Sequence, residues 1–473
     1  MITFTVALLL LIGGYFTYGK FVEKIFGPDK NRKTPAITQA DGVDFIAMPT
    51  WKIFMIQFLN IAGLGPIFGA IMGAKFGVAS YLWIVLGTIL AGATHDYISG
   101  MLSLRHNGES LPEVVGRYLG ITAKQLMRGI SILLMVLVGA VFVSGPAGLL
   151  ESLTPGFLNV TSWIVIIFAY YFLATFLPVD KIIGRIYPAF AAALLFMALG
   201  VLFMIFWHQP DLPEITTLGS VEHPDMLDIL PYMFVSIACG AISGFHATQS
   251  PMMARCMKNE KYGRPIFYGA MVAEGIVTLI WAAAAMSYFG EHGMAENNAA
   301  IVVNDITYNW LGAFGGVLAL LGVILAPITT GDTVLRSARL IVADMFHIDQ
   351  RNLLKRILVC LPIFGITLGL LIYSIQDANG FNIIWRYLSW LNQLLAVFTL
   401  WAVTVYLVQQ NKLYVITLVP ALFMTAICSI YIFMAPEGLG LSKWLSYGIG
   451  GGLTLVSMVW FAVWQARYRR GRI

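Results

Sequence analysis

The sequence predicts an all-helical protein that crosses a membrane many times. Of its 473 residues, 59% are hydrophobic and 11% are charged, whereas soluble domains carry about 25% charged residues. Many apolar stretches come close to the ~20 residues that cross a hydrocarbon core. Two of these stretches are interrupted by glycine, proline and polar residues. Composition and segment length therefore define the fold class, and the two interruptions indicate where a polar site lies.

Thirteen apolar stretches are candidate transmembrane helices. The first has no basic segment before it and no small-residue cleavage site after it, so we expect it to be retained and not removed as a signal peptide. No linker or low-complexity run marks a soluble domain, so residues 1–473 are expected to form one transmembrane domain. The expected helices are Ile2–Tyr18, Ile53–Met72, Tyr81–Leu104, Ile130–Leu150, Ser162–Leu177, Ile186–Trp207, Ile229–His246, Ile266–Phe289, Leu311–Ile328, Leu354–Tyr373, Ile384–Val408, Tyr414–Phe433 and Tyr447–Trp464.

Lysine and arginine alternate between the connections. Odd-numbered connections, their edges and the C-terminal tail hold 26 of them, even-numbered connections hold 2, and Arg386 lies inside a span. Because basic connections stay in the cytoplasm, we expect residues 19–52 to form a cytoplasmic loop, with the N-terminus outside and the C-terminus inside. The net charge of +5 is therefore explained by a chain that sits in a lipid bilayer. We expect the bilayer as a partner and no nucleic acid. Nothing in the pattern fixes the oligomeric state.

The two interruptions are Gly63–Pro66 in the second span and Ser243–Pro251 in the seventh. With the first span set aside, the next ten divide into five at residues 53–207 and five at 229–408, followed by two additional spans at 414–464. Since five is odd, the two units lie in the membrane with opposite orientations, an inverted repeat. This is the logic of the LeuT-type (APC superfamily-like) fold, whose repeats each begin with a discontinuous helix. The alternative is that the glycines only permit close helix packing.

The second interruption is the richer in polar groups. Gly244 gives flexibility, and Phe245, His246 and Gln249 follow it. Polar groups are costly in hydrocarbon and usually face a cavity or another polar group. Free N–H groups at a half-helix end, together with His246 and Gln249, could hold an anionic or amide-bearing substrate. Alternatively, these side chains only satisfy unwound backbone.

The first interruption places Asn60 one turn before Gly63 and Gly65. Exposed backbone carbonyls there would suit a cation. Adjacent hydroxyls, such as Thr329 and Thr330 near the end of the ninth span, could complete an all-oxygen shell for sodium. The alternative is that both threonines bond their own helix backbone.

Two acidic residues could carry a proton, because an intramembrane acid is a functional candidate by default. Glu274 lies within the eighth span. Asp332 follows the two threonines, and an ion pair with Arg336 four residues later is the favoured interpretation.

A metal-dependent intramembrane enzyme is the alternative function, and it would use His95, Asp96 and His246. His95 and Asp96 are expected near the cytoplasmic end of the third span. Neighbours on a helix point about 100° apart, which disfavours a shared metal. The four cysteines show no metal-type spacing, and no hydrolase, zincin or P-loop motif is present. We therefore expect a non-enzyme without a cofactor, other than a coupling Na⁺ or H⁺.

Several long segments carry a family resemblance. They are Gly65-Pro-Ile-Phe-Gly-Ala-Ile-Met-Gly73, Ala91-Gly-Ala-Thr-His-Asp-Tyr97, Arg105-His-Asn-Gly108, Ser243-Gly-Phe-His-Ala-Thr-Gln-Ser-Pro-Met-Met-Ala-Arg-Cys256 and Ala326-Pro-Ile-Thr-Thr-Gly-Asp-Thr-Val-Leu-Arg-Ser-Ala-Arg339. Through them the chain resembles the carbon starvation protein A (CstA) family. The resemblance implies a bacterial inner-membrane importer, induced when preferred carbon runs out, that takes up peptides or pyruvate with a cation gradient. It also implies kinship with the LeuT-type superfamily. The chain is shorter than the long family members, so the role of their extra C-terminal region is not transferred.

Overall fold

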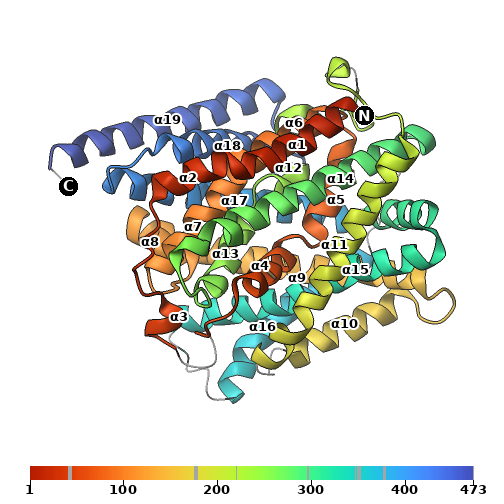
Figure 1. The fold of residues 1–473 in the computed structure, drawn as a ribbon, viewed down its shortest axis with the longest axis horizontal. Helices are drawn as coiled ribbons and strands as arrows, with labels where there is room; N and C mark the ends of the chain where they lie inside the picture. Colours follow the sequence, from red (N-terminus) through yellow and green to blue (C-terminus); the bar gives the residue numbers. More distant parts are fainter. Residues whose placement is uncertain are drawn as a thin grey trace.

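The computed structural model describes residues 1–40, 45–174, 179–219, 221–295, 298–346, 348, 353–376 and 380–471. All regular structure in these ranges is helical, which confirms the all-α class. The two termini lie at opposite ends of the helical bundle (Figure 1). The end of the fifth expected span, up to Leu177, lies outside the described residues.

The helices follow one another along the chain, with π-helical and 3₁₀ segments labelled η. They are α1 (Ile2–Phe16), α2 (Tyr18–Phe26), α3 (Pro35–Thr38), α4 (Thr50–Ile61), α5 (Leu64–Ala74), α6 (Ala79–Leu86), η1 (Gly87–Gly92), α7 (Ala93–Arg105), α8 (Leu111–Leu119), α9 (Ile121–Leu153), α10 (Val160–Ala174), α11 (Val179–His208), η2 (Ile215–Thr217), η3 (Ile229–Met233), α12 (Phe234–Ile237), η4 (Ala238–Gly240), α13 (Gly244–Ala254), η5 (Glu260–Tyr262), η6 (Arg264–Tyr268), α14 (Gly269–His292), α15 (Ala299–Met345), α16 (Leu353–Gln376), α17 (Gly380–Gln409), α18 (Val415–Met434) and α19 (Lys443–Arg469).

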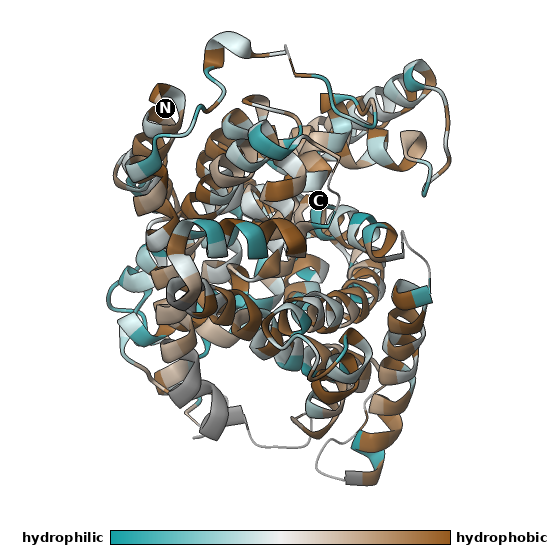
Figure 2. Cartoon of the chain, turned by 90° about the vertical axis from the view of Figure 1, so that its right-hand side faces the viewer, coloured by the Kyte–Doolittle hydropathy of each residue, from teal (hydrophilic) through white to brown (hydrophobic). Residues whose placement is uncertain are grey.

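Ten of the described helical segments are long and apolar enough to cross a membrane, and eleven if the bent pair α4 and α5 counts as one span. Of the other expected spans, one corresponds to the run α6, η1 and α7, and one to α10, which has only 15 described residues. The expected number of thirteen is therefore not confirmed. Figure 2 shows that apolar residues colour most of the helical ribbon, while much of the hydrophilic colour lies in peripheral loops.

The first expected interruption is present. Helices α4 and α5 meet at an angle of 47°, and the residues between them are Ala62 and Gly63. Pro66 lies in the first turn of α5, where its missing N–H is harmless because the first N–H groups of a helix have no partner within that helix. Glycine and proline therefore place the break where the sequence predicted it.

The second interruption lies earlier than expected. The backbone leaves the helix over residues 238–243, with Ala238 at φ +29°, whereas the predicted segment Ser243–Pro251 is almost wholly helical as α13. The reason is a side chain from another helix. Asn392 Oδ1 accepts hydrogen bonds from the Phe245 N–H at 2.7 Å and the Ser243 hydroxyl at 3.0 Å, so that a new helix begins at Gly244.

The two interrupted helices touch through a row of glycines on α5. Gly65 lies against Cys239, Gly69 against the backbone carbonyls of Ser236 and Ile237, and Gly73 against the Ile237 side chain. Small residues spaced four apart allow such close approach of helices in a membrane. The two glycine-rich positions are therefore adjacent in space. The division into repeats at 53–207 and 229–408 stays a prediction.

The charge pattern corresponds to two separate ends of the bundle. At one end, odd-numbered connections meet: Arg105 donates to the Gly27 carbonyl at 2.8 Å, and Arg255 donates to the Gly108 carbonyl at 3.0 Å. At the other end, the Met1 amino group pairs with Glu214 at 2.5 Å and Lys443 with Asp228 at 2.6 Å. Which end faces the cytoplasm stays a prediction, and the first end is called the basic end below.

The ninth expected span, Leu311–Ile328, is too short. Helix α15 runs from Ala299 to Met345 and departs from helical geometry at Gly312, where φ is +68°. It continues past Arg336 because that guanidinium bonds the Ala174 carbonyl at 2.7 Å, which shields the charge from lipid. Thr329 and Thr330 therefore lie inside a long helix and not near the end of a span.

The glycine row predicts a packing defect that one substitution can produce. A Cβ atom at Gly69 would lie 2.9 Å from the Ser236 and Ile237 carbonyl oxygens, and backbone cannot move aside easily. We expect Gly69→Val to destabilise the fold by about 1–3 kcal/mol through overpacking. The measurement is the melting temperature of the detergent-solubilised protein. Gly148→Val in α9 is the control, since nothing lies within 4 Å of that Cβ position; equal melting temperatures for both variants would contradict the packing assignment.

Candidate functional site

The candidate site lies where α7, α13 and α14 pack together, next to α4 and α17. His95 is ten residues before the end of α7 at Arg105, and Glu274 is ten residues after Arg264, where η6 leads into α14. At about 1.5 Å per helical residue, both lie about 15 Å from the basic end, which is half of a ~30 Å hydrocarbon core. His95 and Asp96 were expected near a membrane surface. They lie at mid-depth instead, because α7 carries eight further buried residues after Asp96.

Four ionisable side chains form a continuous cluster, called the buried quartet below. His95 Nδ1 lies 2.8 Å from Asp96 Oδ1, and His246 Nδ1 lies 2.8 Å from Asp96 Oδ2. On the other side of the same imidazole, His246 Nε2 lies 3.3 Å from Glu274 Oε2. All four side chains have no exposed surface. The sequence had grouped His95, Asp96 and His246 only in the metal alternative and had assigned Glu274 to the coupling ion, and the fold brings all four together.

The metal-centre alternative gains no support from this geometry. His95, Asp96 and His246 do meet, but each imidazole turns its Nδ1 to a different oxygen of the Asp96 carboxylate. The carboxylate thus lies between two imidazoles, which leaves no shared point that all three could coordinate. Within the described part of the chain, no group of three histidine, cysteine, aspartate or glutamate residues has the arrangement of a metal site.

Several buried polar atoms on α4, α7 and α13 have no hydrogen-bond partner. Neither the side-chain nitrogen nor the side-chain oxygen of Asn60 on α4 forms a hydrogen bond. The same is true of both side-chain amide atoms of Gln57, one turn earlier. On α13, the Gln249 Oε1 atom also has no partner, as has His95 Nε2 on α7. Native proteins satisfy nearly all such atoms. A polar ligand or water bound between α4, α7 and α13 would supply the missing partners.

Asn392 on α17 is a site residue that sequence reasoning missed. Besides capping α13, its Nδ2 lies 2.9 Å from Cys239 Sγ. Its neighbour Gln393 donates to the Phe234 carbonyl, and Thr88 in η1 donates to the Gly240 carbonyl at 3.0 Å. These side chains satisfy the backbone around the second break. The two adjacent amides, Asn392 and Gln393, in the middle of a mainly apolar span were the signal that could have indicated them.

The predicted sodium ligands lie on α15, which packs against both α4 and α5. The Thr329 hydroxyl donates to the Leu325 and Ala326 carbonyls at 3.0 and 2.8 Å, and the Thr330 hydroxyl donates to the Ala326 carbonyl at 2.9 Å. These are the bonds to their own helix that the alternative interpretation described. A role in binding an ion stays a prediction for both.

Asp332, farther along α15, forms the expected ion pair with Arg336 at 3.4 Å. Its other predicted role, as a proton carrier, is not tested by that contact.

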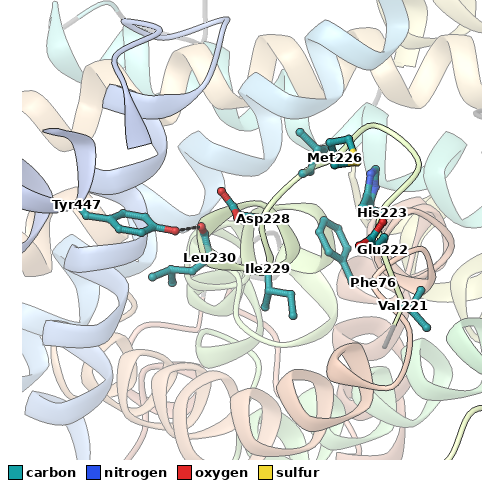
Figure 3. A pocket seen from close by; sticks show the side chains of 10 residues that line it. Phe76, Val221, Glu222, His223, Met226, Asp228, Ile229, Leu230 and Tyr447 are labelled. Carbon is teal, nitrogen blue, oxygen red and sulfur yellow. Dashed lines mark hydrogen bonds between the residues drawn. The ribbon is translucent and has the colours of Figure 1, made fainter. Parts of the chain in front are cut away.

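Two cavities open away from the quartet. The first, about 380 Å³, lies beyond the far end of α5, between Phe76, the loop at 221–230 and Tyr447 (Figure 3). There the rings of Phe76 and His223 are 4.5 Å apart, and burial lowers the pKa of His223. The second, about 510 Å³, is an apolar groove between α6, α12 and α18. Neither was predicted, and neither contains a predicted site residue.

Solved structures with a similar fold are membrane transporters. A Na⁺-coupled sialic acid symporter aligns with a TM-score of 0.55 at 15% identity, covering 96% of both chains. Mhp1, a nucleobase-cation-symport-1 family transporter, aligns with a TM-score of 0.54 at 15% identity, covering 89% of this chain and 93% of its own. At this identity the likeness concerns the fold alone.

Closer sequence relatives are bacterial membrane proteins. A Haemophilus influenzae protein described as an "Uncharacterized membrane protein" is 42% identical over 61% of this chain and 91% of its own length. The Campylobacter jejuni peptide transporter CstA is 28% identical over 63% of this chain and 52% of its own, and the Escherichia coli pyruvate/proton symporter BtsT is 26% identical over 56% and 46%. The chain thus spans about half the length of these two transporters.

The profile of one protein family matches nearly the whole chain. Its matches cover residues 1–156, 154–310 and 290–431, and so include both interrupted helices, the buried quartet and Asn392. The sequence segments that suggested the resemblance lie within these ranges. The chain therefore belongs to the carbon starvation protein CstA family.

Proposed function

We propose that this chain imports a small carboxylate-bearing nutrient, a peptide or pyruvate, across the bacterial cytoplasmic membrane, driven by a cation gradient. It acts as a transporter and not as an enzyme. In this proposal the N-terminus faces outward, the C-terminus faces the cytoplasm, and carbon starvation is the condition of use. Support comes from the family and from relatives whose names refer to peptide or pyruvate transport.

The observation that carries the proposal is the junction of the two interrupted helices. Backbone that leaves the helix at bilayer depth persists only where it is buried in protein or lines a solvated cavity. On the two interrupted helices lie buried amide atoms without partners, both side-chain amide atoms of Asn60 on α4 and the Oε1 atom of Gln249 on α13. Substrate sites of secondary transporters lie at such junctions. A small polar molecule would complete the hydrogen bonds that the protein leaves open.

The start of α13 favours an anionic group. The amino end of a helix carries a partial positive charge from its aligned peptide dipoles, and at α13 this end lies at the second break, beside Gly244, Phe245 and His246. A carboxylate is common to pyruvate and to peptides, whereas amide groups occur only in peptides. The polar groups of Asn60 and Gln249 would contact the rest of the substrate.

The basic end of the bundle is closed by one charged network. Arg105 donates to both Glu260 oxygens, at 3.2 and 3.0 Å, and to the Tyr406 hydroxyl at 2.8 Å. The Asp29 N–H donates to Glu260 at 2.7 Å, and the Phe26 ring lies 4.0 Å from the guanidinium carbon. The network joins α2, α7, η5 and α17. We propose that it is the cytoplasmic gate, which must open for release.

Uptake by purified protein in proteoliposomes tests the function directly. We expect labelled pyruvate, or labelled di- and tripeptides, to accumulate when an inward proton or sodium gradient is imposed, because a cation gradient is the proposed driving force. Four arms separate the two substrate classes and the two ions, and liposomes without protein are the control. No gradient-dependent uptake in any arm would refute the proposal.

Replacing a buried amide separates a substrate contact from a structural one. Asn60 has no partner in the closed structure, so Asn60→Leu should lower uptake strongly and leave the melting temperature equal or higher. Asn392→Leu is the matched comparison, because it leaves the Phe245 N–H and the Ser243 hydroxyl unpaired. A buried group left unpaired costs about 1–3 kcal/mol, so this variant should melt lower. If Asn60→Leu melts as low as Asn392→Leu, or transports normally, Asn60 is not a substrate contact.

The gate predicts a change in accessibility. Glu260→Gln removes the charge that holds Arg105, so the basic end should open more often. Modification of the native Cys239 by a water-soluble maleimide added at that end should then become faster, as measured by mass spectrometry of its peptide. The control is Glu109→Gln, which breaks the exposed pair of Glu109 with Arg117 at the same end and should change nothing, because exposed pairs contribute little. Equal rates in the parent and in Glu260→Gln would exclude Glu260 from the gate.

A further inference from the structure

We propose that the buried quartet, His95, Asp96, His246 and Glu274, is the site that binds the coupling proton, with Glu274 as the group that takes it up and releases it. This inference rests on the proposed transport function and specifies its coupling ion. It rests on geometry: four ionisable side chains from three helices contact one another in series, with no exposed surface.

The hydrogen bonds assign a proton to each Nδ1 atom. Both oxygens of Asp96 accept, one from His95 and one from His246, so Asp96 is held as a carboxylate that faces two N–H donors. A His246 imidazolium would carry its second N–H at Nε2, which lies 3.3 Å from Glu274 Oε2 but forms no hydrogen bond with it. Glu274 lies at ion-pair distance, but neither of its oxygens has a well-directed hydrogen bond. It is therefore the least firmly held member of the quartet.

Charge counting then fixes the number of protons. With both carboxylates ionised and one imidazole protonated, the quartet carries one net negative charge. A net charge without solvent is costly in a protein interior, and more so at membrane depth. One further proton on Glu274, converting its carboxylate to a carboxylic acid, makes the quartet neutral. The closed arrangement thus favours the protonated form.

Other charges near the quartet do not provide this neutralisation. Cys239 in η4 interacts electrostatically with Glu274, but a thiol adds no positive charge. The charged side chains of α15 nearest in depth, Asp332 and Arg336, pair with each other. Tyr81 and Tyr268 are buried and neutral at ordinary pH. Other cations on the helices around the quartet include Lys52, Lys75, Arg105, Arg255 and Arg264 at helix ends, Arg339 farther along α15, and Arg386 on α17, which pairs with Glu437.

Coupling follows from the helices that supply the quartet. His246 is on α13, the part of the second interrupted helix that follows the break, while Asp96 and Glu274 are on α7 and α14. Movement of α13 would part His246 from both carboxylates and admit water. The proton on Glu274 would then pass to that water, and the quartet would need a proton again before closing. Closure without a proton would bury a net charge, which links proton binding to the transport cycle.

The test compares driven accumulation with exchange. Glu274→Gln is neutral and close in shape to the protonated acid, so it should lose proton-driven accumulation in proteoliposomes while exchange of internal for external substrate continues. Glu437→Gln is the control: it removes a buried carboxylate that pairs with Arg386 far from the quartet, and it should retain both activities. Persistent exchange also shows that Glu274→Gln is folded. Proton-driven accumulation in Glu274→Gln at the level of the parent would overturn the proposal, as would accumulation in the parent driven by sodium alone.

A second readout needs no substrate. Infrared difference spectra of the purified protein between low and high pH should contain the carbonyl stretch of a carboxylic acid, and this band should be lost in Glu274→Gln and kept in Glu437→Gln. If the band persists in Glu274→Gln and disappears in Asp332→Asn, the protonated acid is Asp332 on α15, and the assignment to Glu274 is overturned. If the band behaves as expected but the parent transports no carboxylate, the proposed function fails while the proton site stands.

Discussion

Every polar group of the backbone needs a partner inside a membrane, and this requirement shapes the centre of the protein. Where α12 ends, the α-helix is interrupted over residues 238–243, and at that depth water cannot supply partners for the backbone groups that lose their helical hydrogen bonds. Side chains of other helices supply the partners. Asn392 accepts a hydrogen bond from the Phe245 N–H in the first turn of α13, Gln393 donates to the Phe234 carbonyl, and Thr88 donates to the Gly240 carbonyl. The break therefore exists because α17 and η1 hold it open. Once it exists, a helix start, free polar side chains and a histidine all lie at mid-membrane.

The sequence predicted the helical class and the two interruptions because these depend on local signals. Gly63 and Pro66 act through their own backbone, so the first break lies where expected. The second was predicted too late, since Gly244 to Pro251 contains residues that weaken a helix but are stabilised here by Asn392, which lies more than a hundred positions away. Likewise, the threonines of α15 were assigned to a span end because the ninth span was predicted to end at Ile328, whereas α15 continues past Arg336. The bond of Arg336 to the Ala174 carbonyl is a tertiary contact that no local pattern contains.

The candidate site shows the same division between local and distant signals. Each member of the quartet was recognised as an unusual polar residue in an apolar span. The sequence placed His246 with the substrate and Glu274 with the ion, and grouped His95, Asp96 and His246 only in the metal alternative, so that Glu274 was never joined to the other three. Their association depends on how α7, α13 and α14 pack, which neither spacing nor composition reveals. The Asp332 and Arg336 pair was predicted correctly because both residues lie on one helix, four positions apart.

The glycine row on α5 has a consequence for movement. At Gly69 the helix meets the carbonyls of α12 with no side chain between them, so these two segments cannot slide or separate without leaving backbone groups bare in the lipid. In the transport cycle proposed above, α5 and α12 would therefore move as one unit. The interruptions at residues 62–63 and 238–243 would then be the places where the chain bends, with α4 and α13 on the other side of each bend.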